Sequence, residues 1–326
     1  MSARVIEALT GSPGQAVLAE VRLSGRAGSV RDEDLQLALY LCYELHYRGF
    51  AGVDERWEWD PGLLSLRSVL ERGFERDLLR RVGRPVAGNP RDLPATLTVL
   101  VESADGPPLA RYLQRSATAQ QFREFVQHRS VYHLKEADPH TWAVPRLAGP
   151  VKAALVDIQA DEYGGGRADR MHSELFRSTM RAFGLTDTYG GYVDSVPAVT
   201  LATSNLISLF GLHRRWRGAL IGHLAAFEMT SSLPNRRYGQ GVRRLGGDDV
   251  AARFFDEHVT ADAVHEQIAT HDLCGGFARQ HPELAGDVLF GAACCLELDA
   301  AFAGHLLDCW RRGVSSLRPE NAARAS

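Results

Sequence analysis

Phe255-Asp-Glu-His-Val-Thr-Ala-Asp-Ala-Val-His265 is the stretch that most strongly indicates both the fold and the chemistry of this chain. It contains the pattern His258-x-x-x-Asp262-x-x-His265. Successive residues of an α-helix are about 100° apart around its axis, so Asp262 lies about 40° and His265 about 20° from His258. The three side chains would therefore share one helix face, where imidazole and carboxylate suit iron or another first-row metal. The alternative is a solvated polar face that carries two histidines by chance.

Helical patterns of apolar residues continue on both sides of this stretch and predict an all-α fold. Residues 1–30 are rich in Gly, Ser and Ala and predict a loose leader. Residues 86–108, rich in Pro and Gly, are the best candidate for a boundary. We expect an N-terminal helical region over residues 1–130 and a helical core over residues 131–326. The predicted helices lie at about 35–46, 61–74, 109–128, 149–163, 167–183, 197–212, 216–232, 248–273 and 282–312.

The composition is that of an ordinary globular protein and argues against two classes of function, nucleic-acid binding and membrane insertion. The chain has 326 residues, of which 45% are hydrophobic and 24% charged, and its net charge of −3 argues against a nucleic-acid surface. We expect no membrane span, since no apolar run approaches the ~18 residues needed, and no signal peptide. The five cysteines include no CxxC pair and indicate buried thiols in a reducing cytoplasm.

A second group of candidate ligands precedes the opening stretch. Glu162, Asp169 and His172 are separated by seven and three residues. If one helix ran through them, Asp169 would lie about 20° and His172 about 80° from Glu162. Gly164-Gly-Gly166 interrupts this segment, and three glycines cost roughly 1 kcal/mol each inside a helix. We therefore expect a break or bulge there, which would rotate one part relative to the other.

Glu228 is the most informative single residue, because it lies in a nearly apolar helical segment. Burying an unpaired carboxylate costs several kcal/mol, so Glu228 must be neutralised, hydrogen-bonded or bound to a cation. His223, in the same segment, is an alternative partner.

Together these residues form a set typical of a dinuclear metal site, since one metal rarely needs so many anionic ligands. A ferritin-like four-helix bundle, which would use Glu136 as well, is the nearest structural rival. Against it, both of its x-x-His pairs would use Asp, and His258 would be left without a role. The predicted metal ligands are Glu162, Asp169, His172, Glu228, His258, Asp262 and His265.

At this point the chain resembles the haem-oxygenase-like di-iron oxidases and oxygenases. Within that family, three stretches resemble the actinobacterial "iron-containing redox enzyme" group, and the likeness covers roughly residues 131–315. They are Lys135-Glu-Ala-Asp-Pro-His140, Ile158-Gln-Ala-Asp-Glu-Tyr-Gly-Gly-Gly166 and His172-Ser-Glu-Leu-Phe176. The resemblance implies a seven-helix haem-oxygenase-like core with additional N-terminal helices, two iron ions, O2 as co-substrate and no haem.

The resemblance also bears on individual ligands. His172, Glu228, His258, Asp262 and His265 match the family pattern closely, whereas members differ in which carboxylates of the first helix bind metal. Asp169 stands where the group often has Glu, and its side chain is shorter. Glu136 is a further ligand or a supporting group, outside the firm set.

The function that the resemblance implies is an O2-activating oxygenase of specialised metabolism that N-oxygenates an amine of an amino acid or related metabolite. It also implies a cytoplasmic enzyme with an external electron donor, and leaves a homodimer open. Oxidative C–C cleavage, decarboxylation or desaturation on the same irons is the alternative reaction. The alternative outside enzymes is a helical binding or scaffold protein. Gly239-Gln-Gly241 lacks the third glycine of a dinucleotide site, and the chain has neither a Walker A sequence nor a Gly-x-Ser-x-Gly elbow.

Overall fold

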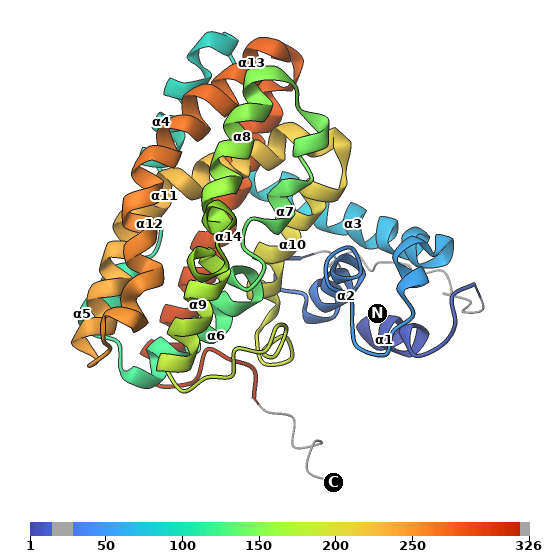
Figure 1. Ribbon diagram of the computed structural model, residues 1–326. Helices are drawn as coiled ribbons and strands as arrows, with labels where there is room; N and C mark the ends of the chain where they lie inside the picture. The colour runs from blue at the N-terminus through green and yellow to red at the C-terminus, as the bar shows by residue number, and fades with distance from the viewer. Residues whose placement is uncertain (15–28, 320–326) are drawn as a thin grey trace.

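The computed structural model describes residues 1–14 and 29–319, and within these ranges every regular element is a helix. The predicted all-α class is confirmed (Figure 1). The main helices are α1 (Ser2–Leu9), α2 (Glu33–Glu44), α3 (Pro61–Val82), α4 (Leu93–Glu102), α5 (Leu109–Arg115), α6 (Ala119–His133), α7 (Asp138–Thr141), α8 (Gly149–Glu162), α9 (His172–Ala182), α10 (Ala198–Leu212), α11 (Arg217–Arg244), α12 (Asp249–Gln267), the π-helix η7 (Ile268–Gly275), α13 (Gly276–Gln280) and α14 (Ala285–Arg311).

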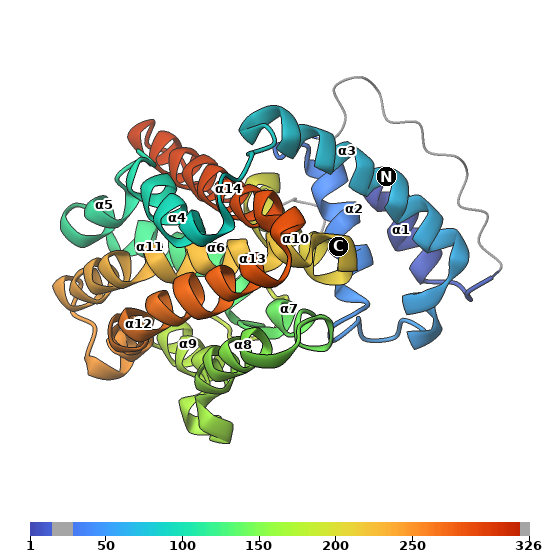
Figure 2. The same cartoon turned by 90° about the horizontal axis from the view of Figure 1, so that it is seen from above.

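Helix α11 is the centre of the bundle. It packs against α5, α12 and α14, and Figure 2 shows it between α14 on one side and α12 on the other. Two glycines allow the closest of these crossings. A Cβ added to Gly222 of α11 would lie 1.9 Å from the carbonyl oxygen of Val288, and one added to Gly291 of α14 would lie 1.9 Å from that of Ala219. The two backbones touch, so any larger residue would force α11 and α14 apart.

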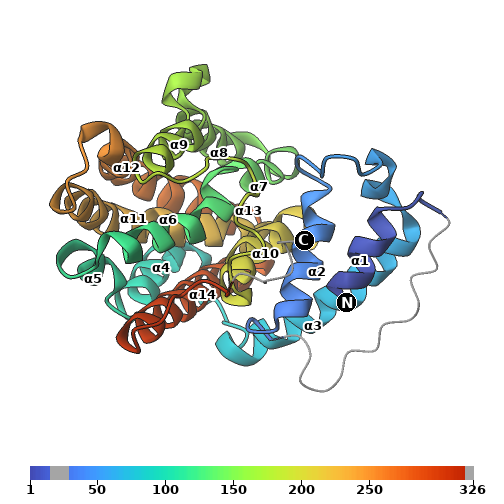
Figure 3. The same cartoon turned by 90° about the horizontal axis from the view of Figure 1, so that it is seen from below.

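Helices α1 to α3 lie together at one side of the bundle, and α2 sits between α1 and α10 (Figure 3). The hydrophobic core is continuous across this contact, because one cluster of buried side chains reaches from Val5 of α1 to Leu298 of α14. Helix α6 runs across the predicted division between residues 130 and 131, and that division stays a prediction.

The structure corrects one prediction about the N-terminal region. Residues 1–30 are not a loose leader throughout, because α1 forms at Ser2–Leu9 and buries Val5 and Leu9; the part of this prediction at residues 15–28 lies outside the described residues. Residues 86–108 hold helix α4, whose Leu93 and Leu97 are buried, and the boundary predicted in this segment stays a prediction.

Two predicted helices have different limits. The segment 109–128 forms two helices, since Thr118 and Gln121 make a capping box that begins α6. Helix α11 continues beyond residue 232 despite Pro234, which costs about 3 kcal/mol inside a helix. Burial of Tyr238 and Val242 beyond the proline offsets that cost.

The expected break at Gly164–Gly166 is confirmed. All three glycines have positive φ, at 65°, 61° and 80°. Helix α8 ends at Glu162, and the 3₁₀ turns η4 (Gly164–Gly166) and η5 (Ala168–Arg170) separate it from α9. The five cysteines are buried and free, as predicted. None of the described helices is long and apolar enough for a membrane crossing.

Candidate metal centre

Seven buried ligand-type side chains meet at the middle of the bundle, each between 1% and 8% exposed. They come from four helices, α8, α9, α11 and α12, and from the turn between α6 and α7. Both α9 and α11 pack against α12, which contributes three of them. Six were predicted from the sequence, and one was not in the predicted set. The cluster consists of Glu136, Glu162, His172, Glu228, His258, Asp262 and His265.

The cluster divides into two positions that share one carboxylate. Ligand atoms of Glu136, Glu162, His172 and His258 all lie within 4.8 Å of one another. Ligand atoms of Glu162, Asp262 and His265 meet the same limit.

The two oxygens of Glu162 face different positions. One lies 2.8 Å from Nδ1 of His172, and the other lies 3.6 Å from Nδ1 of His265. Glu228 belongs to the second position, since its Oε2 is 3.4 Å from Nδ1 of His265. Glu162 therefore belongs to both groups of candidate ligands.

Unpartnered polar atoms indicate that the cluster fits a metal. Among the described residues, Oε2 of Glu136, Nδ1 of His172 and Nδ1 of His265 are buried without a hydrogen-bond partner. Each such atom costs roughly 1–3 kcal/mol when it is left unsatisfied. Nδ1 of His172 lies close to Glu162 but without hydrogen-bond geometry, as expected for atoms aimed at a common cation. A metal at each position would satisfy these atoms.

Neighbouring groups fix the orientation of two imidazoles. Nδ1–H of His258 donates to the carbonyl oxygen of Phe254 at 2.7 Å, which leaves Nε2 free to face Glu136 at 3.6 Å. Nε2 of His265 is 3.0 Å from a carboxylate oxygen of Asp161, so its Nδ1 faces the cluster. Carboxylate or carbonyl partners of this kind are typical of metal-binding histidines.

The carboxylates are also held. Nδ1 of His133 is 2.7 Å from Oε1 of Glu136, and the hydroxyl of Ser231 donates to Oδ2 of Asp262. Oε1 of Glu136 thus lies between His133 and Nε2 of His258, while its Oε2 is left without a hydrogen-bond partner among the described residues.

The charge balance favours cations. Burial raises the pKa of Glu228 to about 7, and the nearby negative charges of Glu162 and Asp262 act in the same direction. Burial acts to lower the pKa of His265, but the contact with Glu228 and the surrounding carboxylates outweigh it and raise that pKa to about 9. Without metal, protons are therefore retained where a cation would otherwise balance the carboxylates.

Asp169 lies outside the cluster. Its side chain is 66% exposed and pairs with the guanidinium of Arg167 at 3.0 Å. The helical phase expected for it does not apply, because α8 ends at Glu162 and the chain turns before α9 begins. A Cβ on Gly164 would lie 2.6 Å from the backbone carbon of Arg170, so this turn needs glycine. The turn places His172, and not Asp169, beside Glu162.

Two further sequence interpretations are decided by contacts. His223 faces His140, with 3.4 Å between their ring nitrogens, so it is not the partner of Glu228. Glu136, left outside the firm set, lies in the first position. It lies in the turn between α6 and α7 and precedes Ala137, whose φ of 70° is left-handed. No sequence signal marks that turn. Asp161 was also missed, although it directly precedes Glu162.

A small cavity of about 50 Å³ adjoins the cluster. Besides five of the clustered residues, it is lined by polar and aromatic side chains that include Tyr132, His140, Gln159, Phe227 and Asn235. The side-chain nitrogen of Gln159 donates to the carbonyl oxygen of Ala137 at 3.0 Å. Its oxygen is buried and has no hydrogen-bond partner within the described part of the chain.

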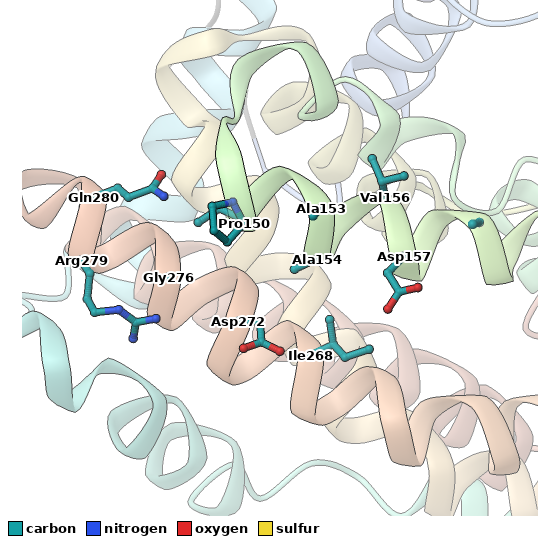
Figure 4. A pocket seen from close by; sticks show the side chains of 12 residues that line it. Pro150, Ala153, Ala154, Val156, Asp157, Ile268, Asp272, Gly276, Arg279 and Gln280 are labelled. Atoms are coloured by element: carbon teal, nitrogen blue, oxygen red, sulfur yellow. The ribbon is translucent and has the colours of Figure 1, made fainter.

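A larger hollow of about 810 Å³ lies on the outer side of α8, against η7 and α13 (Figure 4). Asp157 and Arg279 stand at opposite ends of it, and Asp272 lies between them (Figure 4). Of the residues that line it, none belongs to the cluster.

Comparisons with known proteins agree with this geometry. The model of a family described as iron-containing redox enzyme matches residues 123–300, more than half of the chain. A nitrosourea synthase of Streptomyces achromogenes subsp. streptozoticus is 28% identical over 150 residues, which are 45% of this chain and 31% of that protein. The match thus spans less than a third of the relative's length. The chain belongs to the iron-containing redox enzyme family and is therefore an oxidoreductase.

Proposed function

We propose that this protein is a non-haem di-iron oxygenase that uses O2 to oxidise the nitrogen of an amine on an amino acid or related metabolite. The observation that carries the proposal is the pair of positions that share Glu162. Glu136, His172 and His258 would complete the first position, and Glu228, Asp262 and His265 the second. Iron held there would supply the activation of O2.

The charges of the cluster support two divalent cations. Four carboxylates and three neutral imidazoles carry a charge of −4, which two Fe(II) ions balance. A single Fe(II) would leave a buried negative excess, which is costly in a medium of low polarity. A balanced centre also lets a neutral amine approach without an electrostatic penalty.

The cavity supports an amine substrate. Gln159 is held by its side-chain nitrogen, which donates to Ala137 and, at 2.7 Å, to the hydroxyl of Thr141. Its unpartnered oxygen would accept a hydrogen bond from a substrate N–H and orient the nitrogen lone pair. Phe227 and Leu224 line the same cavity and would exclude water from the reacting atoms. At about 50 Å³ the cavity holds O2 and a reacting group but not a whole amino acid, so its lining must move on binding.

The relative supports oxidation at nitrogen. The name nitrosourea synthase denotes a product that carries a nitrogen–oxygen bond. For the present chain the amine, the electron donor and the number of irons belong to the proposal.

The proposal is tested by loading the metal-free protein with Fe(II) under anaerobic conditions and exposing it to ¹⁸O2 with a panel of amines and amino acids. We expect two irons per chain, faster O2 consumption with one substrate class and a product that gains labelled oxygen at nitrogen. Glu162→Gln should abolish both iron binding and product. Loss of CO2 or of two hydrogens, without a nitrogen–oxygen bond, would indicate the alternative oxidase reactions. A protein indifferent to Fe(II) would be a scaffold.

A further inference from the structure

A buried ion pair joins the N-terminal helices to the segment that carries Glu136. Nζ of Lys135 lies 2.8 Å from a carboxylate oxygen of Glu44, at the C-terminal end of α2, and both side chains are only 1% exposed. The ammonium group also lies over two aromatic rings of the N-terminal region, 4.9 Å from the centre of Tyr40 and 4.4 Å from that of Tyr47. Lys135 is thus enclosed by residues from outside the part of the chain that the family model matches.

The second carboxylate oxygen of Glu44 accepts a hydrogen bond from another segment of the chain. The hydroxyl of Tyr189, in the loop between α9 and α10, donates to it at 2.6 Å. Arg48 lies 4.2 Å from the ring centre of Tyr189 and donates to the carbonyl oxygen of Leu134 at 3.2 Å. Both oxygens of the buried carboxylate are therefore used, and the network holds residues 134 and 135 from the side of α2.

The two neighbours Lys135 and Glu136 contact opposite sides of the structure. Lys135 contacts α2, whereas Glu136 contacts His133 and faces His258 of the cluster. The next residue, Ala137, takes a left-handed φ of 70°, which an alanine adopts only when its surroundings enforce it. Gln159 holds the carbonyl oxygen of Ala137. The orientation of Glu136 thus depends on contacts made on both sides of this short turn.

We propose that α2 positions the metal ligand Glu136 through the Glu44–Lys135 ion pair, which makes Glu44 and Lys135 positioning residues for the first metal position. The N-terminal helices then belong to the support of the metal centre. The inference rests on the two metal positions of the proposed function but not on the reaction or the substrate.

The test compares metal binding of full-length variants. A Glu44→Leu/Lys135→Met double variant removes both charges together, so no lone buried charge penalises folding. Anaerobic Co(II) titration, followed by visible absorption, separates the two positions. Glu136→Gln serves as the reference for a weakened first position and Asp262→Asn for a weakened second one. Thermal unfolding of each metal-free variant checks that it is folded.

We expect the double variant to reproduce the Glu136→Gln pattern, with affinity at the first position reduced about 10- to 100-fold and the second unchanged. Arg81→Met is the matched control. It removes two ion pairs of α3, one of 2.9 Å with Glu297 of α14 and one of 3.1 Å with Asp77. None of these three residues forms a hydrogen bond or ion pair with a cluster residue in the described ranges. The control variant should bind Co(II) like the wild type.

Two outcomes would overturn the inference. A folded double variant with wild-type affinity at both positions would show that α2 does not position Glu136. Equal weakening in Arg81→Met would show a general loss of stability instead of a specific effect. A wild-type chain that bound fewer than two ions would contradict the proposed metal centre itself. That result concerns the wild type, so it is distinguishable from both outcomes above, which concern the variants.

Discussion

Helix α12 and the adjoining ends of α8 and α9 both supply candidate metal ligands, but they hold them in different ways. In α12, His258, Asp262 and His265 lie on one face of a continuous helix, and the 3.6-residue period alone brings them together. At the adjoining ends of α8 and α9, Glu162 ends one helix and His172 begins the next.

The contact between Glu162 and His172 depends on the turn between them. That turn contains three glycines with positive φ, and one of them packs against the backbone of Arg170. Helix geometry thus fixes the three side chains of α12, whereas the contact between Glu162 and His172 depends on a turn that requires glycine at position 164. The two groups of side chains should therefore respond differently to substitution.

The largest effect is expected from Gly164→Ala. Its φ of 65° is unfavourable for alanine, and the added Cβ would lie 2.6 Å from the backbone of Arg170, so the turn must open. His172 and Glu162 would separate, and the first metal position would be lost. Gly165→Ala is the matched control, since φ is 61° but the Cβ meets nothing within 4 Å. It should cost about 1–2 kcal/mol of unfolding free energy and retain metal. Iron titration and thermal unfolding of both variants check this, and equal iron binding would contradict the role of the turn.

A smaller effect is expected from Asp161→Asn, which tests how His265 of α12 is held. Asp161 contacts Nε2 of His265 at 3.0 Å, and removing the carboxylate loosens the ring and weakens its donor strength. Metal affinity at the second position should fall about 10- to 100-fold, with the first unchanged. Asp157→Asn is the control. Asp157 lies one turn before Asp161 on α8, is exposed and lines the outer hollow. If both variants bound metal equally well, Asp161 would have no orienting role.

The contribution of His265 and Glu228 to the stability of the metal-free protein should fall as the pH rises. The pKa of His265 is raised to about 9 and that of Glu228 to about 7. Between the ordinary and the raised pKa of each group, the folded state therefore holds a proton that the unfolded state has lost. The stabilisation from His265 is complete below about pH 6.5 and is lost as the pH passes 9. Metal must displace these protons, so Co(II) affinity should rise over the same range. Thermal unfolding of the wild type and of His265→Gln at several pH values, with and without Co(II), measures both trends, and a stability difference between the two metal-free proteins that did not shrink from pH 6 to pH 9 would contradict them.

The smallest effect is expected from Asp169→Asn. Its exposed pair with Arg167 contributes little to stability because solvent screens it, and no metal position depends on it in this structure. Iron binding and O2 consumption should match the wild type. A loss of one iron would instead show that the segment between α8 and α9 rearranges to bring Asp169 to the metal.

Regular helices are the part of this protein that sequence reasoning predicts best. The helical period of α12 predicted three residues of the cluster. Glu228 was predicted because it is an isolated acid in the apolar part of α11, and burial of a lone carboxylate needs a compensating partner. The break at Gly164 was also predicted. What the sequence does not encode locally is the direction that the chain takes after a break.

Asp169 and Glu136 illustrate this limit from opposite sides. A continued helix would have placed Asp169 beside Glu162, but the turn sends it to the surface. Glu136 lies in a turn in which the next residue, Ala137, is left-handed and the preceding residue, Lys135, contacts Glu44 of α2, a residue far away in the sequence.

The central claim is that two metal ions share Glu162. Its most direct test is a crystal structure of the protein loaded anaerobically with Fe(II), with anomalous diffraction recorded at the iron absorption edge. The account predicts two anomalous peaks, one on each side of Glu162. The first would be bounded by Glu136, His172 and His258, and the second by Glu228, Asp262 and His265. A single peak, or two peaks of which only one contacts Glu162, would contradict it.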